Sequence, residues 1–385
     1  MNPFFNYDEL TWPEVEALPR DMPLVLPLGG GYDLELLASR LGNPPKIGLL
    51  PIFPFGWRGS GLEVAPILLG RCVGNLLGSL KKQGFTRRYA LTSLEKIPLL
   101  ADDSVLTQPP KPNGAHALPL PTEADRDKVL LIPIGHTEQH ALHLPLCVDT
   151  IIIDAVARGT AAAIPDKAFS LPVMPYGVST HTYSFPGTFD SGGRSFEDFW
   201  CAIVDALVEQ GFDRFYLMSG HGGNTSFLVN VVKYSGERHR RIFCATAFLH
   251  TSGPVGAAAL ERYRTSAIGG MGHACELETS FMLHLRPELC HMERVVDETD
   301  FIATPSYYMD WIEGGSLVAN PPWDDDTKTG AYGAGSHATA EKGRLWLSAA
   351  IEEKVGHVLE IHEQQRRREA RRAAGYGRWD RNSRA

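Results

Sequence analysis

The sequence predicts an α/β fold in which a largely parallel sheet is covered by helices on both faces. Short runs rich in Val, Ile and Leu have the length of buried strands and end at glycine or polar loops, as in KVLLIPIG, RFYLMSG and RIFCATAF. Helical stretches lie between them, such as SFEDFWCAIVDALVEQG, which opens at Ser195 and closes at Gly211. This alternation is typical of a parallel sheet with both faces covered. Functional residues in such sheets usually lie in loops at the carboxyl ends of the strands.

The overall composition favours a globular protein with a small-molecule substrate. Of the 385 residues, 43% are hydrophobic and 21% are charged, and the net charge of −8 gives no general attraction to nucleic acid or anionic membranes. The six cysteines include no C-x-x-C pair, the first residues do not resemble a signal sequence, and no apolar run is long enough to span a membrane. We therefore expect reduced thiols, a cytoplasmic location, and no nucleic-acid or membrane partner.

Four regions are predicted along the chain. They are an N-terminal α/β region (1–105), a proline-rich linker (106–127), a catalytic domain (128–362) and an Arg-rich tail that prolongs the last helix (363–385). The first region echoes the third, because PRDMPLVLPLGG resembles DRDKVLLIPIGH and LKKQGFTRRYALTS resembles LVEQGFDRFYLMSG. Two interpretations remain open: the first region is a degenerate, metal-free duplicate, or the echo reflects patterns that any two α/β segments share. The region is expected to enlarge a subunit interface or to cover a neighbouring subunit's site.

A short segment after the strand KVLLIPI is dense in metal-binding side chains. PIGHTEQHALHLPLCVDT places Glu138 and His140 two residues apart, so both side chains can point to the same side of an extended strand end. Asp149 follows nine residues after His140, which leaves room for the chain to turn back. Imidazole and carboxylate groups together suit Zn, Mn or Fe(II). The segment therefore supplies three candidate ligands, one short of a four-coordinate site.

Two further segments offer the missing ligand. His221 lies in YLMSGHGGN directly after a strand, in a glycine loop where the backbone can approach a bound ion or substrate. MGHACELETS adds His273, Glu276 and Glu278. A His-Gly-Gly loop is often only a turn, and Glu-x-Glu is often a solvated helix face. The shared position of these segments at predicted strand ends nevertheless favours a metal centre.

These segments, with LTWPEVEAL, YGVSTHTYSFPGT and GAYGAGSHATAEKG, resemble the creatininase (creatinine amidohydrolase) family in the same order. The resemblance covers about residues 127–345. It implies an α/β/α sandwich and a hydrolase with two divalent metal ions per subunit, Zn first and Mn or Fe(II) as alternatives. It also implies a homo-oligomer, a hexamer built as a trimer of dimers.

The resemblance assigns roles to individual residues. Glu138 and His221 would hold one metal and His140 the other, Asp149 would bridge the two, and His273 falls where the family has its catalytic histidine. Further expected contacts lie around this set. His143 and Asn224 would orient the ligands, and His181, Tyr183 and Trp311 would line the substrate pocket.

The chain departs from the creatinine-hydrolysing members at one ligand position. Those members place Glu two residues after the histidine of the Gly-His loop, where this chain has Gly223. Glu276 lies three residues from His273, one helical turn away, so we expect it to replace that ligand and to assist catalysis. Gly222 and Gly269 also stand where aromatic residues surround the ring substrate in those members. The Ser-Gly-His-Gly-Gly-Asn loop therefore favours a branch of the family that does not use creatinine.

The predicted function is metal-dependent hydrolysis of a non-peptide C–N bond in a cyclic amide, a formamide or a small amide. A metal-activated hydroxide would attack the carbonyl, and His273 would carry the proton to the leaving nitrogen. The backbone N–H groups of Gly222 and Gly223 would bind the developing oxyanion. Two alternatives remain: hydrolysis of a sugar-like lactone or ketone at a C–O or C–C bond, and metal binding without catalysis.

Overall fold

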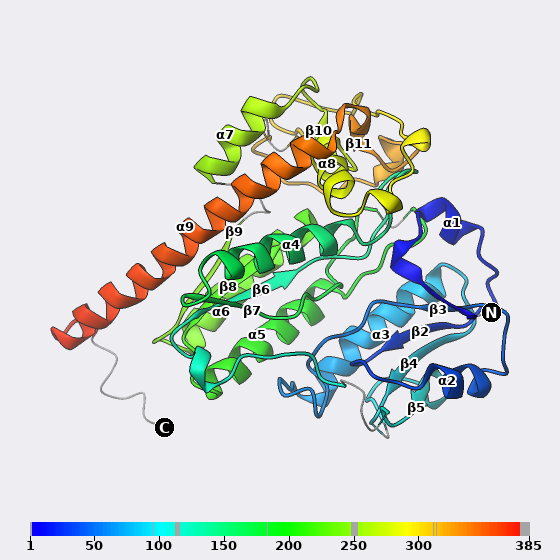
Figure 1. The fold of residues 1–385 in the computed structure, drawn as a ribbon, viewed down its shortest axis with the longest axis horizontal. Coiled ribbons are helices and arrows are strands. Elements are labelled where there is room, and N and C mark those ends of the chain that lie inside the picture. Colours follow the sequence, from blue (N-terminus) through cyan, green and yellow to red (C-terminus); the bar gives the residue numbers. More distant parts are fainter. Residues whose placement is uncertain are drawn as a thin grey trace.

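The computed structural model describes residues 2–94, 96–111, 116–182, 184–247, 253–310, 312 and 314–377. Two parallel sheets, each with its own helices, lie side by side and share a core (Figure 1). We call residues 2–127 the N-terminal unit and residues 128–377 the C-terminal unit. Within the described part of the chain, no helix combines the length and apolar character needed to cross a membrane.

The C-terminal unit is built on a four-stranded parallel sheet in the order β7-β6-β8-β9. Its strands are β6 (Val129–Ile134), β7 (Ala168–Ser170), β8 (Arg214–Ser219) and β9 (Phe243–Ala247). Helices α4 (Val148–Ala163) and α9 (Ala340–Ala373) cover one face, and α5 (Gly193–Glu209) and α6 (Thr225–Arg238) cover the other (Figure 1). Every residue of β6 is buried, as expected for a central strand between two layers of helices. The prediction of an α/β fold with a parallel sheet is confirmed.

Helix α5 shows how the sequence specifies these elements. Its buried apolar residues recur at three- and four-residue spacings and form one stripe, made of Phe196, Phe199, Trp200, Ile203, Val204 and Leu207. The helix ends at Glu209, and Gly211 follows with a φ of 94°, a left-handed conformation that suits glycine. The helix predicted between Ser195 and Gly211 is therefore present.

A smaller layer lies at the carboxyl ends of the strands. Strand β10 (Met271–His273) pairs antiparallel with β11 (Tyr332–Gly333), and α8 (Glu276–Leu285) follows β10 directly. Helices α7 (Pro254–Tyr263) and α8 both pack against α9. Among its described residues, the segment between α8 and β11 contains only short 3-10 turns and isolated bridges.

The N-terminal unit has a five-stranded parallel sheet in the order β1-β3-β2-β4-β5. Its strands are β1 (Phe4–Asn6), β2 (Leu24–Pro27), β3 (Ile47–Leu49), β4 (Arg88–Thr92) and β5 (Val105–Thr107), and its helices are α1 (Trp12–Glu16), α2 (Leu34–Arg40) and α3 (Pro66–Lys82). The predicted linker therefore begins inside β5 and contributes its first residues to this sheet. Residues 112–115 of that linker lie outside the described part of the chain.

Four strands of the N-terminal sheet repeat the arrangement of the C-terminal sheet. The strand order β3-β2-β4-β5 matches the order β7-β6-β8-β9. Neighbouring strands are also paired in the same register in the two sheets, so that Pro27 lies opposite Leu91 as Pro133 lies opposite Met218. The chain segment that follows β3 and β7 repeats as well. The N–H of Phe53 donates to the carbonyl of Pro27 (2.8 Å), as that of Met174 donates to Pro133 (3.0 Å). Phe53 and Met174 lie in the similar segments LPIFPFG and LPVMPYG.

Helices α3 and α5 join the two units. One cluster of buried apolar residues runs through both units at this contact. Phe53 packs edge-on against Phe199 with ring centroids 5.6 Å apart, and Phe55 packs against Trp200 at 5.9 Å. The N-terminal unit is therefore part of the protein's core and not a separately tethered domain.

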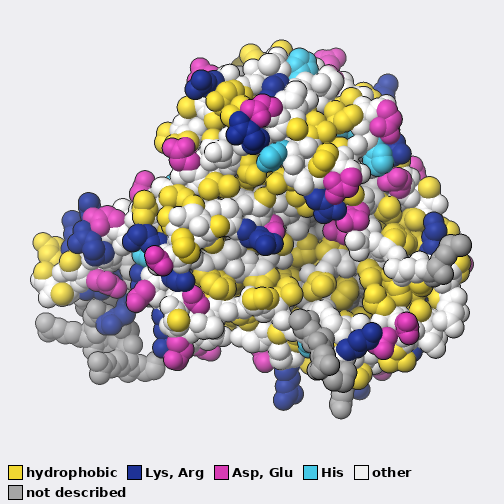
Figure 2. Space-filling view, viewed as in Figure 1, with side chains coloured by type: hydrophobic (Ala, Val, Ile, Leu, Met, Phe, Trp, Pro, Cys, Tyr) yellow, Lys and Arg dark blue, Asp and Glu magenta, His cyan; other side chains and the backbone are white. Residues whose placement is uncertain are grey.

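Helix α9 projects beyond the rest of the molecule at its C-terminal end (Figure 1). The predicted tail thus begins as helix up to Ala373, and residues 378–385 lie outside the described part. Lys and Arg side chains gather over the projecting end in Figure 2. Arg366 and Arg367 there pair with Glu363. Such exposed pairs are typical of a solvated helix and contribute little stability.

Candidate metal centre

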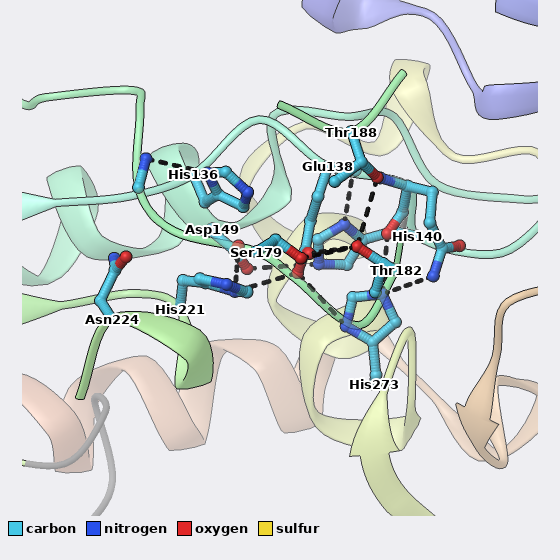
Figure 3. Close-up of polar contacts among 12 residues, drawn as sticks. His136, Glu138, His140, Asp149, Ser179, Thr182, Thr188, His221, Asn224 and His273 are labelled. Atoms are coloured by element: carbon cyan, nitrogen blue, oxygen red, sulfur yellow. Dashed lines mark hydrogen bonds and ion pairs between the residues drawn. The ribbon is translucent and has the colours of Figure 1, made fainter. Parts of the chain in front are cut away.

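Five of the predicted site residues meet at the carboxyl ends of the strands (Figure 3). Glu138 and His140 lie in the loop after β6, Asp149 lies in the first turn of α4, His221 follows β8, and His273 ends β10. All five residues are at least 95% buried. The fold thus brings together titratable groups that are up to 135 positions apart in the sequence, from Glu138 to His273.

His221 forms one half of this cluster with two carboxylates. Its Nδ1 atom lies 3.0 Å from Oε1 of Glu138 and 3.3 Å from Oδ2 of Asp149. Its Nε2 atom donates to the carbonyl of Val178 (3.0 Å), so the lone pair of the neutral ring lies on Nδ1. Burial alone would lower the pKa of His221, but Glu138 and Asp149 raise it well above its ordinary value. The site therefore favours a positive charge at this point, either a proton or a cation.

His140 forms the other half with the second oxygen of Asp149. Its Nδ1 atom donates to the carbonyl of Glu138 (3.2 Å), which leaves Nε2 facing Oδ1 of Asp149 at 3.2 Å. Burial opposes a charged ring, but Asp149 raises the pKa of His140 to about 9. Asp149 thus presents one oxygen to each histidine, which is the arrangement expected of a bridging carboxylate.

Glu278 completes this second half. The ligand atoms of His140, Asp149 and Glu278 lie within 4.8 Å of one another. Burial raises the pKa of Glu278 to about 7 against the lowering effect of His140. One of its oxygens, Oε2, accepts from the N–H of Ala274 (2.6 Å), which fixes the carboxyl group at the start of α8.

Glu276 does not join the cluster, and this part of the prediction needs correcting. Its carboxylate accepts from the N–H groups of Thr265 (3.0 Å) and Ser266 (2.8 Å) and pairs with Lys342. The prediction assumed a helical turn between His273 and Glu276. However, His273 ends a strand and α8 begins only at Glu276. Residues two apart on a helix point to different sides, so Glu278 faces the cluster and Glu276 does not.

The donor set fits divalent cations. Among the residues that the structure describes, three buried atoms of the cluster have no hydrogen-bond partner: Oε1 of Glu138, Nε2 of His140 and Oδ2 of Asp149. Buried polar atoms without partners are rare, and here they converge from three elements. Imidazole nitrogens and carboxylate oxygens are the ligands that Zn and Mn accept. The residues present could hold one cation between Glu138, His221 and Asp149 and another between His140, Asp149 and Glu278.

His273 approaches the cluster from β10 with a fixed ring orientation. Its Nε2 atom donates to the carbonyl of Gln139 (2.7 Å), so the lone pair lies on Nδ1, which is 3.7 Å from Oε1 of Glu138. Burial lowers the pKa of His273 to about 3, so the ring is neutral. Its Nδ1 atom could accept a proton or bind a cation, because the ligand atoms of Glu138, His140 and His273 also lie within 4.8 Å of one another.

His136 is a site residue that sequence reasoning missed. Its Nδ1 accepts from the N–H of Gly177 (2.9 Å), so in the neutral ring Nε2 carries the hydrogen, and that buried atom has no partner in the described part of the chain. Burial lowers the pKa of His136 to about 3 and keeps the ring neutral. The ring lies 4.5 Å from that of His221, centroid to centroid. His136 thus offers a hydrogen-bond donor beside the cluster. His136 lies in the segment PIGHTEQHALHLPLCVDT, but only the structure shows which of its ring nitrogens is free.

Hydroxyl groups surround Glu138, and the sequence did not single them out. Thr182 donates to Oε2 of Glu138 (3.1 Å), and its oxygen lies 2.7 Å from that of Ser179 and 3.3 Å from that of Thr188. Thr188 also accepts from the N–H of Gln139 (3.1 Å). These contacts hold one carboxylate oxygen of Glu138 away from the cluster and leave Oε1 directed into it.

The two residues expected to orient the ligands have different contacts. Asn224 accepts from the N–H of Val178 (2.9 Å) and donates to the carbonyl of Gly135 (3.3 Å), so it ties the end of β6 to the loop whose Val178 carbonyl holds His221. His143 hydrogen-bonds through Nε2 to the hydroxyl of Thr279 on α8 (3.0 Å), and its contact therefore ties the loop to that helix.

A cavity of about 780 Å³ opens above the cluster. Glu138, Asp149, His221, His273 and Glu278 form part of its lining, together with the predicted contacts His181, Gly222 and Gly223. Aromatic side chains of Phe227, Tyr307, Tyr308 and Trp323 form much of the remaining wall. Among the described residues that line it there is no Lys or Arg. Tyr183 and Trp311 lie outside the described part of the chain.

Gly223 is required by the way the loop packs. A Cβ atom on this residue would lie 2.4 Å from Nε2 of His221 and 2.4 Å from the carbonyl oxygen of Val178. No side chain fits at that distance, so a glutamate could not stand at this position without moving His221. A further carboxylate near the cluster comes instead from Glu278 on α8, whose ligand atom lies within 4.8 Å of those of His140 and Asp149.

A sequence model described as Creatininase: Creatinine amidohydrolase matches residues 120–358. The chain belongs to the creatininase family. Within this family it is 28% identical to the creatinine amidohydrolase of Pseudomonas putida, over 59% of this chain and 86% of the relative. It is also 28% identical to a mycofactocin precursor peptide peptidase of Mycobacterium ulcerans (60% and 84%) and 24% identical to a 3-dehydro-scyllo-inosose hydrolase of Thermotoga maritima (64% and 80%).

Solved creatininase structures share the fold of the C-terminal unit. One described as creatininase Mn aligns with a TM-score of 0.51 and 26% identity over 63% of this chain and 92% of its own. A creatininase mutant described as Zn–Zn type gives 0.51 and 25% over 63% and 93%. This creatininase-family protein is thus a metal hydrolase with buried His and carboxylate clusters. The family match begins at residue 120, so nearly all of the N-terminal unit is additional.

Proposed function

We propose that this protein is a binuclear metal hydrolase that cleaves the C–N bond of a non-peptide amide, namely a cyclic amide, a formamide or a small amide. The observation that carries this proposal is Asp149, whose two oxygens face His140 and His221 separately at the floor of an open cavity. Two divalent cations held there, Zn first and Mn or Fe(II) as alternatives, would polarise a carbonyl and lower the pKa of water.

The chain's own residues supply proton transfer and hydrogen bonds. His273 is neutral, with the lone pair of Nδ1 facing the site, so it can take a proton and pass it to the leaving nitrogen. Gly222 and Gly223 line the cavity, and their backbone N–H groups would bind the oxygen on which negative charge develops. The free Nε2–H of His136 is a further donor for an oxygen in the site.

We place the protein in a branch of the family that does not use creatinine. Two observations support this. The crowding at Gly223 excludes the glutamate of the creatinine-hydrolysing members, and the cavity of about 780 Å³ has room for more than a small ring. The second candidate function, hydrolysis of a sugar-like lactone or ketone, is supported by the similarity to the Thermotoga maritima hydrolase.

Metal content per chain tests the centre directly. We expect elemental analysis of protein purified without chelator to find about two metal ions in the wild type and about one in Glu278→Gln. Glu276→Gln is the matched control, because it changes the same group two residues away, and it should retain two. Loss of metal from the Glu276 variant alone would contradict the proposed ligand set. Hydrolysis of lactams and formamides, compared with peptides, lactones and keto sugars, would then identify the bond.

We infer that the N-terminal unit is a degenerate, metal-free copy of the C-terminal unit. The matching strand order, registers and segments after β3 and β7 support this inference. In that correspondence Gly30 takes the place of His136 and Leu94 that of His221, so the N-terminal unit has neither imidazole ring. Trp57 and His116 fill the equivalent strand end, with ring centroids 4.4 Å apart and Nδ1 of His116 bonded to the carbonyl of Gly30 (2.9 Å).

The state of assembly is a separate proposal. We propose a cytoplasmic homo-oligomer, a hexamer arranged as a trimer of dimers, that acts on a small molecule and binds neither nucleic acid nor membranes. The net charge of −8 and the mixture of charges on the face shown in Figure 2 support the last point. Light scattering on the purified protein should give six times the chain mass of 42.3 kDa.

A further inference from the structure

One face of α3, in the N-terminal unit, carries three polar side chains in a stripe. Asn75, Ser79 and Gln83, the last at the C-cap, are spaced four residues apart and therefore lie one above another along the helix. The stripe faces residues 187–191 of the C-terminal unit. This segment lies between residues 178–181, which line part of the cavity, and α5, and it contains no strand or helix.

The stripe satisfies the backbone of that segment. Gln83 donates from Nε2 to the carbonyl of Thr188 (2.9 Å) and accepts through Oε1 from the N–H of Gly187 (2.9 Å). Ser79 accepts from the N–H of Asp190 (3.1 Å), and Asn75 donates to the carbonyl of Ser191 (2.7 Å). Four backbone groups that would otherwise need water or a strand partner are thus fixed by a rigid helix of the other unit.

The segment matters because Thr188 reaches the metal centre. Its hydroxyl accepts from the N–H of Gln139 and lies 3.3 Å from the hydroxyl of Thr182, which holds Glu138. The carbonyl of Gln139 in turn fixes the ring of His273 (2.7 Å). Gln83 is therefore connected to the predicted ligand Glu138 through Thr188 and Thr182. It is connected to His273, the predicted proton carrier, through Thr188 and Gln139.

The packing of α3 on α5 also has the geometry of a two-fold contact. Arg71 and Asp198 occupy equivalent positions on the two helices and pair with each other at 3.7 Å. Gln210, at the C-cap of α5, is the equivalent of Gln83, and its Nε2 donates to the carbonyl of Gly61 in the N-terminal unit (3.1 Å). Contacts between equivalent residues are the mark of an isologous interface. The N-terminal unit thus takes the place that a second copy would occupy.

We propose that α3 is a built-in positioning element of the metal centre, and that Gln83 is a positioning residue that acts through Thr188 on Glu138 and His273. The inference rests on the metal centre proposed above. It explains what a unit without its own ligands contributes: it holds the active-site segment of the other unit in place.

The chain offers a matched pair for the test. Gln83→Met and Gln210→Met make the same change at equivalent positions, but only Gln83 holds a segment that reaches the site. We expect Gln83→Met to weaken Zn²⁺ binding, measured by competition with a chelator, by about tenfold, since contacts beyond the ligands affect affinity on that scale. It should also shift the visible absorption of the Co²⁺-substituted protein. Gln210→Met should leave both readouts at the wild-type value.

Equal behaviour of the two variants in both readouts would overturn the proposal. If Gln83→Met does not fold, Thr188→Val and Thr188→Ser give the same answer. The valine should reproduce the loss of affinity, and the serine, which keeps the hydroxyl, should restore most of it; a valine variant with wild-type affinity would overturn the proposal. Wild-type protein without metal would instead refute the proposed function, so the two failures are distinguishable.

Discussion

At the scale of single residues, the site is defined by where each polar atom points. His140 and His221 each use one ring nitrogen to bind a backbone carbonyl, and this leaves the other nitrogen facing a carboxylate. The sequence identified both histidines, because they follow predicted strands. It could not identify which nitrogen is free, because that depends on the carbonyl of Val178, 43 positions from His221.

Zinc binding should release protons from the metal-free site. The neighbouring carboxylates raise the pKa of His140 to about 9, so this ring is protonated at pH 7, and they raise the pKa of His221 well above its ordinary value. A cation that binds a protonated ring nitrogen must displace its proton. We expect at least one proton to be released at pH 7, measured by calorimetry in buffers of different ionisation enthalpy. Release of none would show that the cation binds elsewhere.

The same pKa shifts give the metal-free protein a defined pH dependence. Groups whose pKa is raised on folding contribute stability that is complete below their unfolded pKa, about 6.5 for His, and that is lost as the pH rises through the folded value. For His140 that window ends near pH 9. The thermal midpoint of metal-free protein should therefore fall between pH 6.5 and 9. A midpoint that rises over this range would contradict the assignment.

Gly223→Ala should disable the His221 side of the centre. The added methyl group would lie 2.4 Å from both Nε2 of His221 and the carbonyl of Val178, so the ring must move. We expect the variant to lose about one metal ion per chain. Gly236→Ala on α6 is the control, because a Cβ there meets nothing within 4 Å, and it should raise stability by about 0.5–1 kcal/mol. Full metal content in Gly223→Ala would show that the loop tolerates the shift.

At the scale of elements, sequence reasoning succeeded where the signal is local. The strand β6 is a continuous apolar run, and α5 carries its own apolar stripe, so both could be predicted from their residues alone. The choice between Glu276 and Glu278 failed because it depended on where α8 begins. That boundary is set by the pairing of β10 with β11, about 60 residues later in the chain.

Helix α9 contains a buried ion pair whose removal tests how the C-terminal helices are tied together. Glu353 accepts from the N–H of Gly256 at the start of α7 (2.8 Å) and pairs with Lys354 at 3.1 Å, and both side chains are at least 98% buried. Glu353→Gln would leave an unpaired ammonium group in the core. We expect a loss of about 3–5 kcal/mol in the free energy of unfolding, measured in urea. Glu352→Gln, the change at the neighbouring position, should have little effect.

At the scale of the whole molecule, the sequence indicated two α/β regions but not how they meet. The echo between them was visible in the residues. Their contact was not, because it depends on pairs such as Gln83 and Thr188 that lie 105 positions apart. Long-range contacts of this kind have no signature in composition or periodicity. The expectation that residues 1–105 cover a neighbour's site remains untested, whereas their contact with the site of their own chain is direct.

Removing the N-terminal unit should unfold the rest of the chain. A deletion of residues 1–105 would uncover the aromatic face of α5, including Phe199 and Trp200, which now packs against Phe53 and Phe55. Exposed apolar surface of this kind leads to aggregation. We expect the truncated chain to be recovered mainly as aggregate, assessed by size-exclusion chromatography. A monodisperse truncated protein with its full metal content would argue that the two units fold independently.

The common core of the two units carries a final consequence. A ligand that binds only the folded state stabilises everything that unfolds together with its site. One apolar cluster runs through both units. Metal bound by the C-terminal unit should therefore slow amide hydrogen exchange in β2 and β4, although these strands do not contact the proposed metal ligands. A cell short of metal would then lose the entire chain to proteolysis, and not merely its activity. The supply of a trace element would in this way set the lifetime of the protein.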